Sequence, residues 1–192
     1  MDKKLYDKLY SKWDKKVYQH VGKPKMPYAL AGLKYLKDRT VVDIGSNAGV
    51  ITYDICEYAK EYIGLEKSEH YYKQSLITQP YIKKPGKFLN LSVSEFLQDT
   101  ENDYFYDAVY ASCVLYHLTQ EEIELVETVM LPKCEVVVAV SREDKMKTTS
   151  APSRIKYLYK AKKIDKWLKK NGFSTEKLNE KSNWVTIVGK KK

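Results

Sequence analysis

Four residues near the start of the chain have the types and the spacing of a nucleotide-binding turn. Gly45 and Gly49 flank three small residues, so the backbone can turn tightly there and a ligand can touch it directly. Asp43 leads into the turn, where its charge would repel a pyrophosphate but suit a cationic group. Glu66 follows at the tip of a predicted strand, where a carboxylate can accept both hydroxyls of a ribose. These residues predict a site for a nucleoside ligand with a cationic end.

Two strands and a helix must position these side chains. The apolar, β-branched run 41–44 predicts a buried strand, the stretch 50–59 predicts a helix with one apolar side, and 62–65 predicts a second strand. The helix begins near Gly49 and would offer unpaired backbone N–H groups and its positive dipole end to an anionic group. A strand, a turn of small residues, a helix and a strand ending on an acid form the beginning of a Rossmann-like nucleotide site.

The turn resembles the first motif of the class I S-adenosylmethionine (SAM) dependent methyltransferases, which reads roughly D-x-G-x-G-x-G. Residues 43–49 read DIGSNAG, with Asn47 in the middle glycine's place. The dinucleotide fingerprint G-x-G-x-x-G fits less well, because Asp43 would repel the pyrophosphate of a dinucleotide. SAM has no phosphate, and its ammonium and sulfonium groups suit Asp43. The resemblance implies SAM as cofactor and S-adenosylhomocysteine (SAH) as product. It implies cofactor contacts by Asp43, Gly45, Ser46, Asn47, Gly49, Glu66, Lys67, Ser92, Val93, Ser112 and Cys113.

Two further stretches carry the resemblance, which covers about residues 40–189. Ser92, Val93 and Ser94 follow a predicted strand at 87–91, where family members often place an acid for the adenine amino group. Here the contact would come from backbone or a hydroxyl. Residues 104–118 resemble the pattern F-D-x-V-x-x-x-x-V-L-x-H-L, whose loop faces the methyl group. That pattern occurs in methyltransferases of small metabolites and in some wobble-uridine tRNA methyltransferases.

Few residues are candidates for catalysis. The methyl group of SAM is already activated, so the protein mainly positions and desolvates the acceptor, and a base helps only a protonated acceptor. His117 is the best candidate base, with a structural hydrogen bond as the alternative role. Tyr116 would line the acceptor pocket or pack in the core. Cys113 lacks the preceding proline typical of pyrimidine carbon-5 methylation, and the Asn/Asp-Pro-Pro-Tyr loop of exocyclic-amine methylation is also missing.

The remaining elements predict an α/β fold: a Rossmann-like, seven-stranded, mostly parallel sheet with helices on both faces and a C-terminal antiparallel hairpin. We expect one compact domain, with residues 1–39 as a basic helical lid and residues 40–192 binding SAM. The alternative for the N-terminal helix is simple packing on the sheet. The polar stretch 142–152 predicts a mobile loop at the sheet's edge. The other predicted helices are 2–21, 28–36, 68–78, one starting at Thr119 and 154–170, and the other strands are 104–111, 134–141 and the hairpin 173–180 with 184–188.

Charge divides the chain into three parts. Residues 1–40 carry a net charge of +7, residues 41–141 carry −9 and residues 142–192 carry +11, for a total of +9. Basic ends of this kind suit a polyanion, and we favour RNA as the methyl acceptor. Only three basic residues are arginine, however, and a lysine-rich composition can arise without nucleic-acid binding. The alternatives are a small-molecule acceptor and a SAM-binding partner protein without catalysis.

Composition also predicts where in the cell the protein works and whether it binds a membrane or a metal. The chain has no apolar run of membrane-spanning length and no signal-peptide pattern, so we expect a cytoplasmic protein without a membrane partner. Its three cysteines are odd in number and show no C-x-x-C pair. This favours a reducing compartment and predicts no metal site. The oligomeric state is not predicted by any of these features.

Overall fold

The structure, a computed structural model, describes residues 27–79, 82, 84–99, 104–142, 160–179 and 184–192. The predicted helix at 2–21, most of the predicted loop 142–152 and the start of the predicted helix 154–170 lie outside the described residues.

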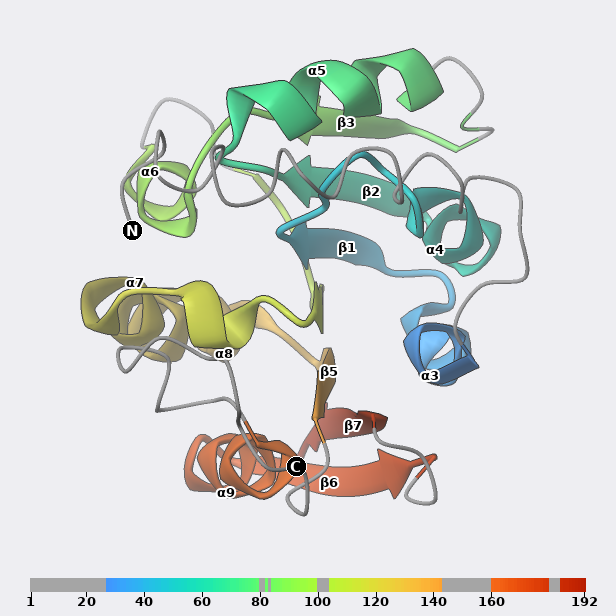
Figure 1. Ribbon diagram of the computed structural model, residues 1–192. Coiled ribbons are helices and arrows are strands. Elements are labelled where there is room, and N and C mark those ends of the chain that lie inside the picture. Colours follow the sequence, from blue (N-terminus) through green and yellow to red (C-terminus); the bar gives the residue numbers. More distant parts are fainter. Residues whose placement is uncertain (1–26, 80–81, 83, 100–103, 143–159, 180–183) are drawn as a thin grey trace.

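One sheet of seven strands organises the described part of the chain, in the order β3-β2-β1-β4-β5-β7-β6 (Figure 1). β1 to β5 pair in parallel, whereas β7 is antiparallel to both of its neighbours, β5 and β6. This confirms the predicted α/β fold with a C-terminal antiparallel hairpin. The strands are β1 (Thr40–Ile44), β2 (Glu61–Leu65), β3 (Gly86–Leu89), β4 (Ala108–Ser112), β5 (Val136–Arg142), β6 (Phe173–Leu178) and β7 (Trp184–Lys191).

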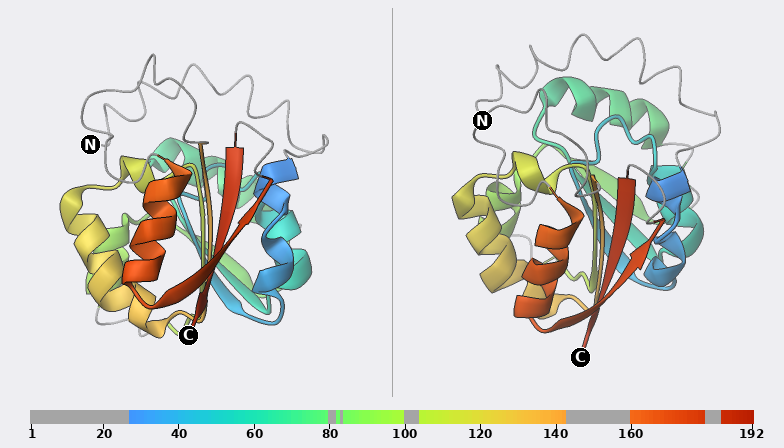
Figure 2. Two further views of the ribbon diagram at one scale, coloured as in Figure 1. Left: turned by 90° about the horizontal axis from the view of Figure 1, so that it is seen from below. Right: turned by 60° about the horizontal axis from the view of Figure 1, so that its bottom comes forward.

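Helices cover both faces of the sheet, as the edge-on view of Figure 2 shows. Both faces are apolar because successive strand residues point to opposite sides: Val42 and Ile44 pack in one core cluster, and Val41 packs in another. The helices on the Val41 face are α3 (Pro27–Leu30), the 3-10 turn Leu33–Leu36, α4 (Thr52–Tyr58) and α5 (Glu69–Thr78). Those on the other face are α6 (Val93–Gln98), α7 (Gln120–Leu125) with its extension through a π-helical turn (Val126–Met130) into α8 (Leu131–Lys133), and α9 (Ala161–Lys170).

Two predicted elements have different bounds in the structure. The helix expected at 28–36 is broken at Gly32, where a Cβ would lie 2.5 Å from a methyl carbon of Val138, so the chain needs glycine to pass this close to the sheet. The fourth strand starts at 108 instead of 104. Its expected first residue, Tyr104, stacks on Phe96 with ring centroids 5.1 Å apart, and this packing replaces strand pairing.

Residues 27–39, which we predicted as part of a lid, pack against the sheet. The side chains of Leu33 and Leu36 are buried in the core. The Tyr110 hydroxyl donates a hydrogen bond to the Ala29 carbonyl at 2.9 Å. These contacts fasten the segment to β4, and residues 1–26 of the predicted lid lie outside the described residues.

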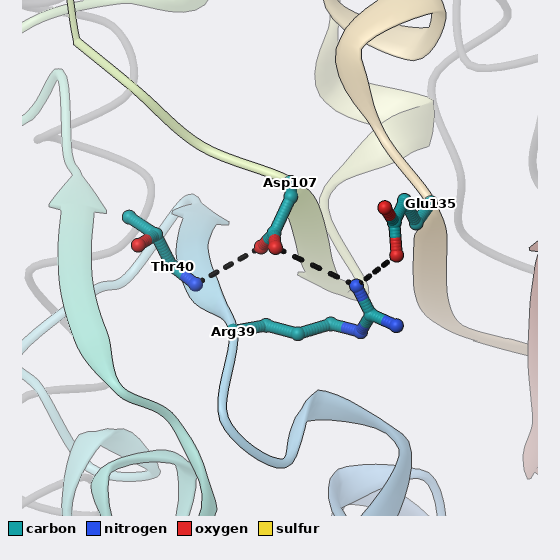
Figure 3. A network of polar contacts seen from close by, with 4 residues as sticks. All are labelled: Arg39, Thr40, Asp107 and Glu135. Atoms are coloured by element: carbon teal, nitrogen blue, oxygen red, sulfur yellow. Dashed lines mark hydrogen bonds and ion pairs between the residues drawn. The ribbon is translucent and has the colours of Figure 1, made fainter.

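A polar network joins β1, β4 and β5 at their amino ends (Figure 3). Arg39 donates to Asp107 at 3.5 Å and to Glu135, and the other carboxylate oxygen of Asp107 accepts the Thr40 N–H at 3.0 Å. The network fixes the strand starts and leaves the opposite, carboxyl edge for other functions.

Candidate active site

The candidate site lies at the carboxyl edge of the sheet, where the strand order reverses. The chain runs from β1 outward through β2 to β3 and then returns to β4 on the other side of β1. The arrows of β1 and β2 point to this edge in Figure 1. Open parallel sheets bind ligands at such a switch point, because the loops on its two sides diverge and leave a crevice.

A cleft opens at this edge, with about 330 Å³ of space that no atom fills, part of it open to solvent. Its walls are mainly apolar, and its ionisable side chains are two glutamates and a lysine. The lining residues come from the ends of β1, β2 and β3 and from the segment after β4: Ile44, Gly45, Leu65, Glu66, Lys67, Leu91, Ser92, Val93, Val114, Leu118 and Glu122.

The turn after β1 needs the conformations that its sequence allows. Gly45, Asn47 and Gly49 all have positive φ, at 70°, 55° and 75°. A Cβ on Gly45 would lie 2.6 Å from a methyl carbon of Val114, so only glycine fits there. Asn47 tolerates the left-handed conformation, and its side-chain oxygen accepts the next backbone N–H at 2.7 Å. The Ser46 hydroxyl is buried without a hydrogen-bond partner among the described residues.

Glu66 holds two loops of the site together. Its side chain is buried, with 2% of the residue exposed. One carboxylate oxygen accepts the Asn47 N–H at 3.0 Å, and the other accepts the Ser68 N–H at 2.7 Å. The Asn90 side chain donates to the Glu66 carbonyl at 2.7 Å.

Ser92 and Val93 line the cleft, but the Ser92 side chain is engaged in capping α6. Its oxygen accepts the Glu95 N–H at 3.2 Å and its hydroxyl donates to Glu95 at 2.7 Å. The same Glu95 oxygen accepts the Ser92 N–H at 2.6 Å. This reciprocal capping box fixes the start of α6 and commits the hydroxyl that we predicted as a possible adenine contact.

The loop after β4 begins with a strained residue. Cys113 has a φ of 58°, and its N–H donates to the Val140 carbonyl at 3.0 Å. This conformation turns the chain so that Val114, instead of Ser112 or Cys113, lines the cleft. The predicted cofactor contacts of Ser112 and Cys113 stay predictions.

His117 ends the short 3-10 turn Leu115–His117 and is partly buried. Burial, and then the positive charge of Lys67, lower the pKa of His117 to about 4. The imidazole is therefore neutral at physiological pH and is a weak base. The Tyr116 ring lies beside it, with ring centroids 4.5 Å apart. Neither side chain lines the cleft itself, and their predicted catalytic roles stay predictions.

Asp43 is buried on the α4 side of the sheet and does not line the cleft. The Tyr62 hydroxyl donates to its carboxylate at 2.8 Å, and Thr52 donates to the Tyr62 oxygen at 2.9 Å. Burial raises the pKa of Asp43 to about 7, the Tyr62 hydrogen bond lowers it and the charge of Glu66 raises it further. In this position Asp43 links the residues just before the turn to Tyr62 and, through it, to Thr52 at the start of α4. Its predicted contact with the cofactor stays a prediction.

The cleft brings together Gly45, Glu66, Lys67, Ser92 and Val93 from the predicted set. It also includes residues that sequence reasoning missed. The final apolar residue of a predicted strand that enters the site is a signal for three of them, and the match to the V-L-x-H-L pattern is a signal for two others. Glu122 carried no such signal, because an acid in the first turn of a helix has an ordinary capping role. The missed residues are Ile44, Leu65, Leu91, Val114, Leu118 and Glu122.

Two other classes of site were sought in the described part of the chain. It contains no group of three or more His, Cys, Asp or Glu side chains placed to hold a metal ion. None of its helices combines the length and the apolar character needed to span a bilayer.

Comparisons with known proteins identify the fold. No protein-family model matches the chain, and no curated protein does. Magnesium protoporphyrin IX methyltransferase from Synechocystis PCC 6803, with bound SAH, matches with a TM-score of 0.69 and 14% identity over 100% of both chains. A SAM-dependent methyltransferase from Aquifex aeolicus matches with a TM-score of 0.66 and 13% identity, over 91% of this chain and 96% of its own. A Pyrococcus horikoshii protein proposed to be an RNA methyltransferase matches with a TM-score of 0.56 and 17% identity, over 90% of this chain and 88% of its own. The chain has the fold of the class I SAM-dependent methyltransferases.

Proposed function

We propose that this chain, which has the class I methyltransferase fold, transfers a methyl group from SAM to RNA. The observation that carries the cofactor assignment is the arrangement of Glu66. Its buried carboxylate is held by two backbone N–H groups, one on each oxygen, and Glu66 lines the cleft at the switch point of the sheet. Two vicinal ribose hydroxyls are the donors that such a pair of oxygens fits.

The other walls of the cleft fit the remaining parts of SAM. Leu65, Leu91, Val93 and Leu118 provide apolar surface for a nucleobase. Gly45 contributes backbone to the cleft wall, at a position where a side chain would meet Val114. When bound, SAM supplies a methyl group on a positively charged sulfur. The residues of the chain then have to orient the acceptor and exclude water, which together lower the barrier of the displacement.

A general base is a minor part of this mechanism. His117 is neutral above about pH 4, so it can accept a hydrogen bond from an acceptor group near physiological pH. The same low pKa makes it a poor acceptor of a full proton. The site therefore suits an acceptor atom that can attack the methyl group without first losing a proton, such as an unprotonated ring nitrogen, better than a hydroxyl that must lose its proton.

The lysines of α9 support RNA as the acceptor. α9 connects β5 to β6, which run in the same direction, so its first turn lies at the carboxyl edge of the sheet, on the same side as the cleft. The solvent face of this helix is basic, and its one acid, Asp165, pairs with Lys169 at 3.1 Å. Phosphate groups of RNA would lie against this face. The exposed lysines of α9 are Lys162, Lys163, Lys166, Lys169 and Lys170.

A small-molecule acceptor is the second candidate. It is favoured by the match to the porphyrin methyltransferase from Synechocystis, which extends over both whole chains. That enzyme methylates a small acceptor on the same fold. The cleft geometry on the cofactor side is compatible with either acceptor, so the two proposals differ only in the molecule that receives the methyl group.

Labelled methyl transfer tests the proposed function. The protein is incubated with methyl-labelled SAM and a cell extract, and polymer is separated from small molecules. Label in ribonuclease-sensitive polymer is the expected result, and with SAM well below the wild-type Kd it should fall roughly 10–100-fold in Glu66→Gln. Label only in the small-molecule fraction would favour the second candidate. SAM binding without any transfer would point to a SAM-binding partner protein.

Charge reversal tests the RNA surface separately. The triple variant of Lys162, Lys163 and Lys166 to Glu should weaken RNA binding and lower the slope of log affinity against log salt by up to about 2, since each phosphate contact of a single strand contributes about 0.7. The matched control reverses Lys34, Lys60 and Lys73, which are also exposed but do not belong to α9. Equal binding by both variants would remove α9 from the proposal.

A further inference from the structure

Glu122 is a buried acid in the cleft that the proposed function has not yet used. It lies in the first turn of α7, and only 5% of the residue is exposed. It lines the cleft from the β4–α7 side, whereas Glu66 lines it from the β2 side. The walls between the two are apolar. A flat heterocycle with apolar faces and hydrogen-bond donors at its edges matches this distribution.

The recorded contacts of Glu122 leave acceptor capacity in its carboxylate. One oxygen, Oε2, accepts the Thr119 N–H at 2.8 Å, and the Glu122 N–H donates to the Thr119 hydroxyl at 3.1 Å. Among the residues that the structure describes, no cation is in ion-pair contact with Glu122. A buried carboxylate is costly unless donors satisfy it, so a ligand that brings a donor into the cleft would be bound favourably there.

The β3–α6 side of the cleft offers no comparable acceptor. Ser92 uses its hydroxyl within the capping box, and Glu95 is exposed and does not line the cleft. The exocyclic amino group of adenine is a donor and needs an acceptor at the end of the base slot. Glu122 is the carboxylate that lines the cleft besides Glu66.

We propose that Glu122 binds the exocyclic amino group of adenine and so selects SAM over cofactor analogues that lack this donor. The inference rests on the proposed cofactor. It assigns adenine recognition to the helix after β4, whereas Ser92 at the end of β3 caps α6 with its hydroxyl.

Competition between two ligands tests this assignment. S-inosylhomocysteine differs from SAH in that a carbonyl oxygen replaces the amino group. The wild-type protein should bind SAH roughly 10–100-fold more tightly in calorimetry, as expected for a lost hydrogen bond to a charged group. Glu122→Gln should reduce this preference to about threefold or less, because a glutamine amide can also donate to the carbonyl oxygen.

Glu95→Gln is the matched control. Glu95 has the same capping-box position in α6 that Glu122 has in α7, but it lies outside the cleft. Its variant should keep the wild-type preference for SAH. If Glu122→Gln does not fold, Glu122→Asp keeps the negative charge at the helix start and withdraws the carboxylate by one methylene, and the preference should fall in this variant too.

The outcomes are distinguishable. An unchanged preference in a folded Glu122 variant would overturn the assignment of Glu122 while the cofactor proposal stands. A wild-type protein that binds SAH and S-inosylhomocysteine equally would also overturn it. A wild-type protein that binds neither would overturn the cofactor proposal itself.

Discussion

Replacing Asp43 by asparagine should make the folded protein more stable at neutral pH. Asp43 is buried under the turn after β1, and burial raises the pKa of its carboxyl group to about 7. Between these two pKa values, Asp43 is therefore protonated in the folded chain. In the unfolded chain it has already lost its proton, because its ordinary pKa is 3.8. Asparagine keeps an acceptor for the Tyr62 hydroxyl and removes the titration.

The magnitude follows from the two pKa values. One unit of pKa difference corresponds to 1.36 kcal/mol, so a rise from 3.8 to about 7 costs the folded state about 4 kcal/mol once the pH is above the higher value. Because the folded pKa is the higher one, this cost is absent below pH 3.8 and grows as the pH rises toward 7. Relative to the wild type, Asp43→Asn should thus gain up to about 4 kcal/mol in its free energy of unfolding between about pH 4 and about pH 8.

Urea unfolding at several pH values measures the effect as a difference between the two proteins. His117 contributes the opposite trend, because its lowered pKa removes stability as the pH falls from 6.5 toward 4. Both proteins carry His117, so its contribution cancels in the difference. Parallel pH curves for wild type and Asp43→Asn would refute the reasoning.

The same variant separates two roles for Asp43. A direct contact with the ammonium of SAM, which the sequence motif predicts, requires the negative charge, so Asp43→Asn should then weaken SAH binding by roughly 10-fold or more. Support of the turn through Tyr62 requires only the acceptor oxygen, so affinity should then stay within about threefold of the wild type. The burial of Asp43 on the α4 side leads us to expect the second result.

Three further predictions concern other parts of the molecule. Gly45→Ala should lower the free energy of unfolding by about 1–3 kcal/mol in urea titrations, because its φ is 70° and its new methyl group meets Val114; adding Val114→Ala should recover part of this loss, and no recovery would contradict the proposed clash. Asp107→Ala should cost about 1–2 kcal/mol, because the Thr40 N–H loses its acceptor and Arg39 loses one of its two acceptors at the amino ends of the strands. SAH affinity in calorimetry should not change, and weaker binding would contradict the separation of this network from the site. The imidazole of His117 should titrate near pH 4 in NMR spectra assigned with His117→Gln, and a midpoint near 6.5 would contradict its burial.

The sequence was sufficient to predict the sheet because its strands are short apolar runs between turn residues. The run 41–44 and the run 134–141 contain little but β-branched and small residues, and both become central strands. Its errors arose where tertiary packing changed a local pattern. The periodicity at 28–36 predicts a single helix, but the structure divides it at Gly32, which lies close to Val138 in the sheet. Such an approach depends on residues distant in the sequence.

The site was predictable where chemistry and strand ends coincide. Glu66 and Gly45 are conspicuous because an acid and a glycine directly follow apolar strands, and both line the cleft. The position of Asp43 was not predictable to the same degree, since one residue along a strand changes the face of the sheet to which a side chain points. Glu122 was not predictable because its place in the cleft depends on how α7 packs beside α6, which the first turn of a helix does not encode.

Calorimetric titration with SAH tests the central claim, that the cleft around Glu66 binds the methyl donor, most directly. The wild-type protein should bind one SAH per chain. Glu66→Gln should bind roughly 10–100-fold more weakly, because an amide nitrogen then replaces one of the two acceptor oxygens. Glu69→Gln, an exposed neighbour paired with Lys73, should bind like the wild type. Absence of SAH binding by the folded wild-type protein, or equal binding by Glu66→Gln, would contradict the account.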